Sequence, residues 1–249
     1  MKENEIINAA KARFDKQLHT DEYKKIHSND EQLNALLNLM DIKSGMKYLD
    51  IGTGNGYVAF ALAKRYPDIF VWGIDIAENS MQQNNAICEK EKIPNATFVA
   101  YDGIKLPFDR DNFYGAVSRY AFHHFPNIQK FILELNRIIK PEGFFLFSDP
   151  KTYDNDCENF VDQFQQHMND GHVHFYKRKE IETYFNAGGF YVQKEFESTI
   201  RYPRIMDKKY EELLKKTDGK ILDNYKIEFE TEKVYITVSV MNILFIKKS

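Results

Sequence analysis

Three closely spaced glycines mark the stretch of this chain that is best suited to hold a ligand. Gly52, Gly54 and Gly56 follow an apolar run that ends at Ile51 and precede a helical pattern that begins at Tyr57. A glycine turn between a strand and a helix presents unpaired backbone amides and the positive end of the helix dipole to the crevice beyond the strand ends. The sequence therefore predicts a ligand site at this turn.

The spacing of the glycines differs from that of phosphate-binding loops. In the dinucleotide fingerprint the third glycine would stand at position 57, where this chain has Tyr57. A Walker loop ends in lysine and a hydroxyl residue, and the stretch GTGNGYVA contains no lysine. A phosphate group is therefore not the expected ligand of the turn.

Histidines form the second set of chemically active side chains. His123 and His124 follow the fourth predicted strand, and either could act as a general base. The alternative is that this pair only fixes its loop through backbone hydrogen bonds. A further group, in the stretch HMNDGHVHFY, comprises His167, Asp170, His172 and His174. Proximity within one loop does not make ligands converge on an ion, so no metal site is predicted.

Composition narrows the class of protein. The chain has 249 residues, a formal net charge of −3 and two cysteines, which do not make a disulfide framework or a zinc site. No apolar run reaches the roughly 18 residues of a membrane span, and the N-terminal stretch has no signal-peptide core. We expect a cytoplasmic protein without a membrane span. Interspersed charges of both signs argue against a nucleic-acid partner and favour small-molecule chemistry.

Apolar runs alternate with helix-length amphipathic segments, which is typical of a parallel sheet with crossover helices. The predicted strands are short and nearly all apolar, as strands buried on both faces are; they span 46–52, 70–76, 96–102, 114–121 and 143–149. The predicted helices span 28–45, 57–67, 78–92, 127–143, 159–168 and 177–190. Runs 190–202 and 233–248 are interpreted as an antiparallel pair that closes the sheet edge. The predicted fold class is α/β, a Rossmann-like, doubly wound and mostly parallel sheet of seven strands.

Four motifs occur in the order and at the spacings of a known family. LDIGTGNG is followed by GIDI, then by YDGIKLPF, and then by AFHHF with LNRIIKPEGFFLFSD. This series resembles class I S-adenosylmethionine-dependent methyltransferases, and most of all the branch of the ubiquinone and menaquinone C-methyltransferases. The resemblance is strong over residues 46–150 and weak over 175–192.

The resemblance implies S-adenosylmethionine as the cofactor and a role for each motif residue. Asp50 would receive the amino end of the cofactor, Asp75 both ribose hydroxyls, and Asp102 the adenine amino group. Alternatively, Asp50 organises the loop, and aspartates at strand ends act as helix or turn caps. The implied cofactor-binding residues are Asp50, Gly52, Thr53, Gly54, Gly56, Asp75, Ile76, Asp102, Gly103, Ser118, Arg119 and Tyr120.

The resemblance also implies one methyltransferase domain with three parts. Residues 1–45 would form a helical cap, 46–150 the cofactor-binding core, and 151–249 the acceptor side. An insertion at about 202–232 matches no family motif and is expected to act as a lid or cap. Arg201 and Arg204 could anchor an anionic acceptor, or could simply keep the surface soluble.

The expected activity is transfer of a methyl group to carbon, oxygen or nitrogen of a small molecule. The displacement is in line, so it needs alignment and a dry pocket more than a catalytic constellation. Two alternatives stay open, which are methylation of RNA or protein and a non-catalytic module that binds S-adenosylmethionine or S-adenosylhomocysteine. The expected partner is the small methyl acceptor, and a homodimer is a further candidate.

Overall fold

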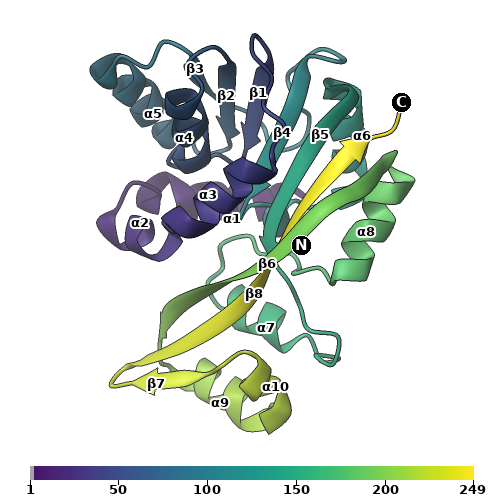
Figure 1. Cartoon of the computed structure of the whole chain (residues 1–249). Helices are drawn as coiled ribbons and strands as arrows, with labels where there is room; N and C mark the ends of the chain where they lie inside the picture. Colours follow the sequence, from purple (N-terminus) through teal and green to yellow (C-terminus); the bar gives the residue numbers. More distant parts are fainter. Residues whose placement is uncertain (1–2) are drawn as a thin grey trace.

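The computed structural model describes residues 3–249 and contains one eight-stranded sheet (Figure 1). The strands are β1 (Lys47–Ile51), β2 (Phe70–Asp75), β3 (Ala96–Ala100), β4 (Phe113–Arg119), β5 (Ile139–Pro150), β6 (Phe190–Ile205), β7 (Glu228–Glu230) and β8 (Lys233–Lys247). Their order is β3-β2-β1-β4-β5-β8-β6, and the short β7 pairs with β8 outside this path. β1 to β5 run parallel, whereas β8 is antiparallel to β5 and β6. The predicted α/β sheet with an antiparallel closing pair is confirmed, but it has one strand more than the seven predicted, because the short β7 pairs with β8.

Helices precede the sheet and connect its strands. They are α1 (Glu3–Gln17), α2 (Asp21–His27), α3 (Asp30–Leu39), α4 (Tyr57–Arg65), α5 (Glu78–Glu91), the 3-10 helix η1 (Phe122–His124), α6 (Ile128–Ile138), α7 (Phe160–Gln166), α8 (Arg178–Ala187), α9 (Lys208–Lys216) and α10 (Gly219–Asn224). Side-chain caps fix several starts, as where the Lys130 amide donates to Asn127 Oδ1 before α6. No helix among the described residues combines the length and apolar character needed to cross a bilayer.

Several predicted helices are shorter than expected, most of all those at 28–45 and 127–143. The helix expected over 28–45 begins at Asp30, because Asn29 accepts the Gln32 amide as its N-cap, and it ends at Leu39. The helix expected over 127–143 ends at Ile138, and β5 starts at the next residue. The phenyl ring of Phe144 lies within 2.6 Å of where a Cβ at Gly115 would be, so the early part of β5 packs tightly on β4. The helix ends at the last residue of its apolar stripe, shortly before Pro141 and Gly143, the residues that the sequence offers as its stop.

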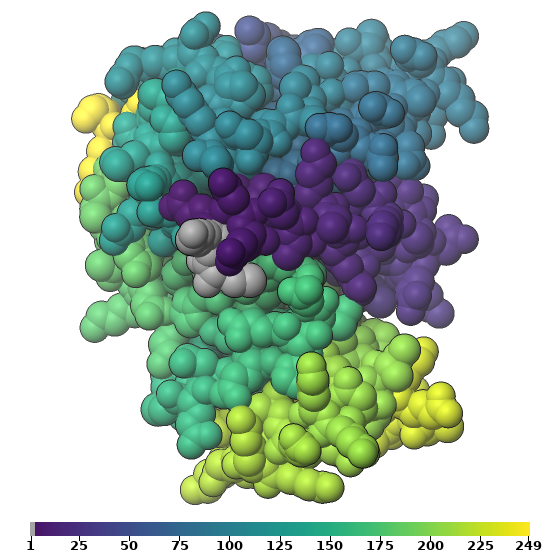
Figure 2. Space-filling model, turned by 180° about the vertical axis from the view of Figure 1, so that it is seen from behind, coloured from purple at the N-terminus to yellow at the C-terminus, as the bar shows by residue number. Residues whose placement is uncertain are grey.

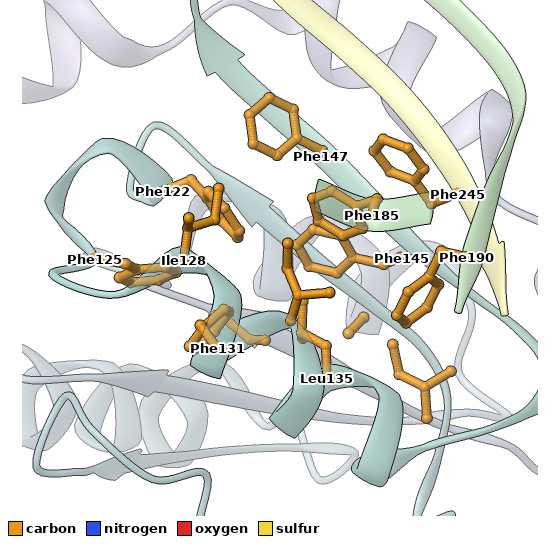
Figure 3. Packing of buried hydrophobic residues seen from close by; sticks show 14 of the residues in the cluster. Phe122, Phe125, Ile128, Phe131, Leu135, Phe145, Phe147, Phe185, Phe190 and Phe245 are labelled. Carbon is orange, nitrogen blue, oxygen red and sulfur yellow. The ribbon is translucent and has the colours of Figure 1, made fainter. Parts of the chain in front are cut away.

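Aromatic side chains fill the space between the sheet and α6 and α8 (Figure 3). The ring of Phe185 on α8 stacks on Phe245 of β8 at 4.1 Å and on Phe145 of β5 at 5.4 Å between ring centroids. Phe122 is fully buried in the same cluster, with its ring 5.1 Å from that of Phe147. Burial of Phe122 anchors η1 and thereby fixes the position of the two histidines that follow it.

The ends of β6 and β8 extend as a twisted arm away from the parallel strands (Figure 1). Helices α7, α9 and α10 pack on this arm around a separate apolar cluster that includes Phe164, Tyr210 and Tyr225. The insertion expected at about 202–232 thus comprises the end of β6, α9, α10 and β7. It forms part of the arm and is held there by its own buried core.

The N-terminal helices lie between the two parts of the molecule. In Figure 2 they form a purple band that separates the blue and teal portion from the green and yellow arm. α1 contacts η1 and α5, and α2 contacts β6. Helices α1 and α2 therefore cover the carboxyl ends of the central strands, where a ligand of this fold would lie, whereas α3 packs against a face of the sheet.

Candidate active site

The glycine turn between β1 and α4 is held open by two carboxylates. Asp50 Oδ2 accepts from Thr53 Oγ1 at 2.7 Å and from the Ala59 amide at 3.1 Å. Asp75 Oδ2 accepts from the Gly54 amide at 2.9 Å. Both carboxylates are buried, and burial raises the pKa of each, to about 6 for Asp50. The turn is therefore preorganised by the chain itself.

Glycine is required in this turn for steric reasons. Gly52 has φ +66°, and a Cβ there would lie 2.3 Å from Cβ of Ala121, which follows β4. Gly56 has φ +79° at the N-cap of α4, where a Cβ would lie 2.5 Å from the Phe60 ring. The backbone of the turn consequently lies bare against the neighbouring loop, with no side chain to block a ligand.

Two adjoining hollows lie over the turn. The loop crevice is lined by the turn, by Asp50 and Asp75, by Arg119 and Tyr120, and by residues of α1 and α2 such as Phe14 and Tyr23. The side slot is more apolar, and it is lined by Ile76, Tyr101 and Gly103 together with Ile7 of α1. Gly52, Asp75 and His124 line both hollows, so the two are continuous.

Most of the predicted cofactor residues line these hollows. Asp50, Gly52, Thr53, Gly54, Asp75, Arg119 and Tyr120 line the loop crevice, and Ile76 and Gly103 line the side slot. Gly56, Asp102 and Ser118 line neither of them. Asp102 Oδ1 instead accepts the amides of Ile104 and Lys105, as a carboxylate does in an Asx turn. Ser118 is buried in β4, and Gly56 caps α4.

Arg119 fastens the N-terminal helices to the end of β4. Its Nη2 donates to the His27 carbonyl at 2.7 Å and to Gln32 Oε1 at 2.8 Å. The Tyr120 hydroxyl donates to the same Gln32 oxygen at 3.0 Å. Arg119 was expected only as a wall of the crevice. Its contacts show that it also holds α2 and α3 in place.

His123 forms a buried pair with Asp149 at the end of β5. Its Nδ1 lies 3.0 and 2.9 Å from the two carboxyl oxygens, and its backbone amide donates to Oδ2 at 3.1 Å. Burial lowers the pKa of His123 to about 3 and raises that of Asp149 well above its ordinary value. Both pKa shifts favour the uncharged form of the group, so the imidazole is neutral. Asp149 fixes the ring orientation and leaves Nε2 as the nitrogen available to a ligand.

His124 occupies the junction of all the hollows. It lines the loop crevice, the side slot and the large cavity described next. Its Nδ1 is buried and has no hydrogen-bond partner in the part of the chain that the structure describes. Burial lowers the pKa of His124, so its ring is neutral as well.

A cavity of about 620 Å³ opens from this junction toward the arm. We call it the large cavity. It is lined by α1 and α2, by Tyr120, His123 and His124, and by the arm through Gln165, His167, Tyr202, Arg204 and Tyr210. A volume of this size suits a small organic molecule. Because Tyr120 and His124 also line the loop crevice, ligands in the two spaces would lie next to each other.

The second histidine group separates in the structure. Asp162 of α7 accepts from His172 Nε2 at 2.7 Å and from His174 Nδ1 at 2.5 Å. His167, Asp170 and His172 line the large cavity, whereas His174 does not. Within residues 3–249 no group of three or more histidine, cysteine or acidic side chains is arranged to hold a metal ion.

Sequence reasoning missed Asp149, Gln32 and Tyr23. Asp149 ends the fifth apolar run just as Asp75 ends the second. This shared position in the sequence could have identified Asp149 as a candidate site residue. Gln32 and Tyr23 belong to helices of the cap, whose placement over the crevice depends on long-range contacts. Arg201 and Arg204, which had been grouped together, point to opposite faces of β6. Arg201 is paired with Glu228, and Arg204 lines the large cavity.

Comparison with known proteins identifies the family. Residues 42–217 match a family model described as a methyltransferase domain. The chain belongs to this methyltransferase family. The match confirms the predicted relationship to methyltransferases, whereas membership of the ubiquinone and menaquinone branch stays a prediction.

Individual relatives are distant in sequence and similar in fold. An uncharacterized methyltransferase of Bacillus subtilis, YcgJ, is 26% identical over 66% of this chain and 64% of its own length. The crystal structure of YcgJ has a TM-score of 0.78 and 20% identity, covering 89% of this chain and 100% of that one. Sterol 24-C-methyltransferase ERG6B of Gibberella zeae is 31% identical over 60% of this chain and 40% of its own length. The chain thus spans less than two thirds of the length of these curated relatives.

A third neighbour is known with its ligands. Phosphoethanolamine N-methyltransferase 2 of Haemonchus contortus was solved in complex with phosphomonomethylethanolamine and S-adenosylhomocysteine. Its TM-score is 0.66 with 18% identity, covering 98% of this chain and 60% of that one. At this level of identity the likeness concerns the fold.

Proposed function

We propose that this protein transfers a methyl group from S-adenosylmethionine to a small organic acceptor. The observation that carries the proposal is the junction of two spaces of different character at Tyr120 and His124. One space is built on a bare glycine turn with carboxylates beneath it. The other is a cavity large enough for a separate molecule. A group-transfer enzyme needs this arrangement, because donor and acceptor must meet in line.

The residues that line the loop crevice and the side slot suit the donor, although the free volumes beneath α1 and α2 are only about 60 and 50 Å³. Each Asp75 oxygen accepts one backbone amide, from Gly54 and from Ala77, so lone pairs remain to accept two ribose hydroxyls. Ile76, Tyr101 and Gly103 form a largely apolar slot for a purine ring, and the bare turn with Asp50 and Thr53 faces the amino-acid end. Arg119 and Tyr120 close the crevice on the side of the transferred methyl group.

Bound S-adenosylmethionine would supply an electrophilic methyl group on a sulfonium. The chain's own contribution is to exclude water, align the acceptor and remove a proton where the acceptor must lose one. His123 is placed for the proton-accepting role, since Asp149 holds Nδ1 and His123 lines the large cavity. The role requires Asp149 to be ionised when the acceptor is bound, because only a carboxylate stabilises the imidazolium that forms when Nε2 takes a proton. His124, at the junction, is placed to contact both the acceptor and the donor.

The test of this function is methyl transfer itself. The protein is incubated with S-adenosylmethionine and fractionated small-molecule extracts, and S-adenosylhomocysteine is followed by mass spectrometry. We expect its formation to depend on an extract fraction and to be lost when His123 is replaced by asparagine. Tight binding of S-adenosylmethionine without product in any fraction would contradict the enzyme assignment and favour a binding module.

A further inference from the structure

The large cavity contains an unusual concentration of buried polar atoms that have no partner. Seven buried side-chain nitrogen or oxygen atoms lack a hydrogen-bond partner among the described residues. Five of them belong to residues that line this one cavity: Arg13 Nε, His124 Nδ1, His167 Nε2, Arg204 Nε and Tyr210 Oη. Leaving a buried donor or acceptor unpaired is costly, so such atoms mark places where a ligand completes the hydrogen bonding.

Three of these atoms come from the arm, at the part of the cavity built by β6, α7 and α9. We call Arg204, His167 and Tyr210 the arm corner. The rings of His167 and Tyr210 lie 4.9 Å apart, and the Arg204 guanidinium lies 4.4 Å from the Tyr202 ring. His167 is distant in the sequence from the other two side chains, and the three meet because β6 and the insertion pack against α7.

Arg204 is held in place by neutral groups only. Its Nη1 donates to the Pro203 carbonyl at 2.9 Å and its Nη2 to Gln165 Oε1 at 2.7 Å. In the described part of the chain no carboxylate lies within ion-pair distance, 4.0 Å, of Arg204 or of Arg13 on α1. A partly buried guanidinium without a counter-ion is suited to bind an anion, because its fork of donors matches carboxylate and phosphate oxygens.

Three carboxylates line the same cavity, and two of them, Asp170 and Asp207, act electrostatically on Tyr210 of the arm corner. Asp207 accepts the Tyr210 amide as the N-cap of α9, and Asp170 accepts the His172 amide. Glu22 of α2 is exposed to solvent. None of the three neutralises Arg204 by a direct ion pair.

Arg201 provides an internal contrast. It lies on the opposite face of β6, three residues earlier, and is 42% exposed in its side chain. Its guanidinium donates twice to Glu228 Oε2, at 2.9 and 2.7 Å, and stacks on Tyr235. One arginine of the pair is thus neutralised by a carboxylate on the surface, and the other faces the Tyr210 hydroxyl inside the cavity and has no carboxylate partner among the described residues.

We propose that the methyl acceptor carries an anionic group, a carboxylate or a phosphate, and that Arg204 in the arm corner binds it. The proposal rests on the proposed function, because it treats the large cavity as the acceptor site. The anion binds at the arm, Tyr210 and His167 complete its hydrogen bonding, and the reacting end of the molecule reaches toward His123 and His124. The insertion, through Tyr210, thereby sets the class of substrate.

The proposal is tested with three probes of matched shape and different charge: 3-phenylpropionate, phenyl phosphate and neutral 3-phenylpropionamide. Their dissociation constants are measured by calorimetry on protein saturated with S-adenosylhomocysteine and on protein without it. We expect at least one anionic probe to bind about tenfold or more tightly than the amide. The preferred anion identifies whether the site takes a carboxylate or a phosphate.

Variants assign the binding to Arg204. Arg204→Gln is expected to weaken the preferred anion about 10- to 100-fold and to leave the amide unchanged, whereas Arg204→Lys weakens it less, because lysine keeps the charge but loses the fork of donors. Arg201→Gln is the matched control and is expected to bind like the unaltered protein. Thermal unfolding of each variant checks that it folds, and Arg204→Lys covers the case in which Arg204→Gln does not.

Two results would overturn the proposal. The first is a failure to prefer the anions, either because the amide and both anions bind equally or because no probe binds. The second is unchanged anion affinity in Arg204→Gln. Affinity for S-adenosylhomocysteine is measured on the same samples and is independent of these outcomes. If it is absent while the anion still binds at Arg204, the proposed function fails and the anion site stands.

Discussion

The glycine turn and the large cavity satisfy their polar groups in opposite ways. In the turn, the carboxylates of Asp50 and Asp75 are bonded by backbone amides and by Thr53 before any ligand arrives. In the large cavity, polar atoms of residues such as Arg13 and Arg204 are buried without partners in the described chain. The first region is preorganised for one ligand shape, and the second is incomplete without its ligand. The residues of the turn therefore indicate the donor by themselves, whereas the acceptor is indicated by the hydrogen bonds that the cavity lacks.

The largest effect is expected at the junction of the two regions. His123→Asn should lower turnover about 10²- to 10⁴-fold, since it removes the proton acceptor, and should leave S-adenosylhomocysteine affinity within about twofold. Turnover and ligand affinity are measured once an acceptor fraction is found. His174→Asn is the control, because His174 is also paired with a carboxylate but does not line the cavity. Equal losses in the two variants would contradict a proton-transfer role for His123.

Replacement of Gly52 should damage the preorganised region. A Cβ at Gly52 meets Ala121 at 2.3 Å in a backbone conformation with φ +66°, so Gly52→Ala should cost about 2 to 4 kcal/mol and abolish tight cofactor binding. Gly45→Ala is a matched control, because φ is +73° there but nothing lies within 4 Å of the new Cβ. It should cost about 1 kcal/mol and leave binding intact. Denaturant unfolding and ligand titration measure both; identical behaviour would show that the close approach is unimportant.

The smallest expected effect concerns an ion pair that supports the cavity wall. The Asp162 hydrogen bond raises the pKa of His174, with further contributions from Glu180. For Asp162, burial favours the neutral acid, but bonds from His172 and His174 outweigh it and lower its pKa to about 2. The His174 contribution to stability is complete below its unfolded pKa of 6.5 and declines as pH rises through the folded value. The Asp162 contribution is present above pH 3.8 and is lost as pH falls toward 2.

His174→Asn should therefore destabilise the protein more at pH 5 to 6 than at pH 8, by on the order of 1 kcal/mol. Urea unfolding of both proteins across this pH range measures the difference. A destabilisation that is constant with pH would mean that the pair does not gain stability from charge.

The sequence predicted the preorganised region better than the incomplete one, for a physical reason. The turn, its strand and its helix are contiguous, so Gly52, Gly54 and Asp50 carry their local geometry with them. The prediction for Asp102 did not hold even in this region, because its side chain accepts backbone amides of a turn and does not line either hollow. Contacts between distant parts were out of reach, as where Arg119 donates to Gln32 across 87 positions.

The two sides of β6 illustrate the same limit. Arg201 and Arg204 look equivalent in the sequence, and only strand register decides which one faces the cavity. The unpaired atoms of the arm corner lie where α7, β6 and α9 pack together, and no sequence motif predicts them. The family relationship accounts for the donor region, and the insertion that matches no motif supplies part of the acceptor wall.

The most direct test of the central claim is thermal unfolding of ligand-free protein with S-adenosylmethionine, S-adenosylhomocysteine and NAD in parallel. A ligand at about 100 times its dissociation constant adds roughly 2.7 kcal/mol, or about 5 to 10 °C for a chain of this size. We expect this shift with the first two ligands, its loss in Asp75→Asn, and its retention in Asp102→Asn, whose carboxylate lies outside both hollows. No shift with either sulfur ligand, or a shift with NAD alone, would contradict it.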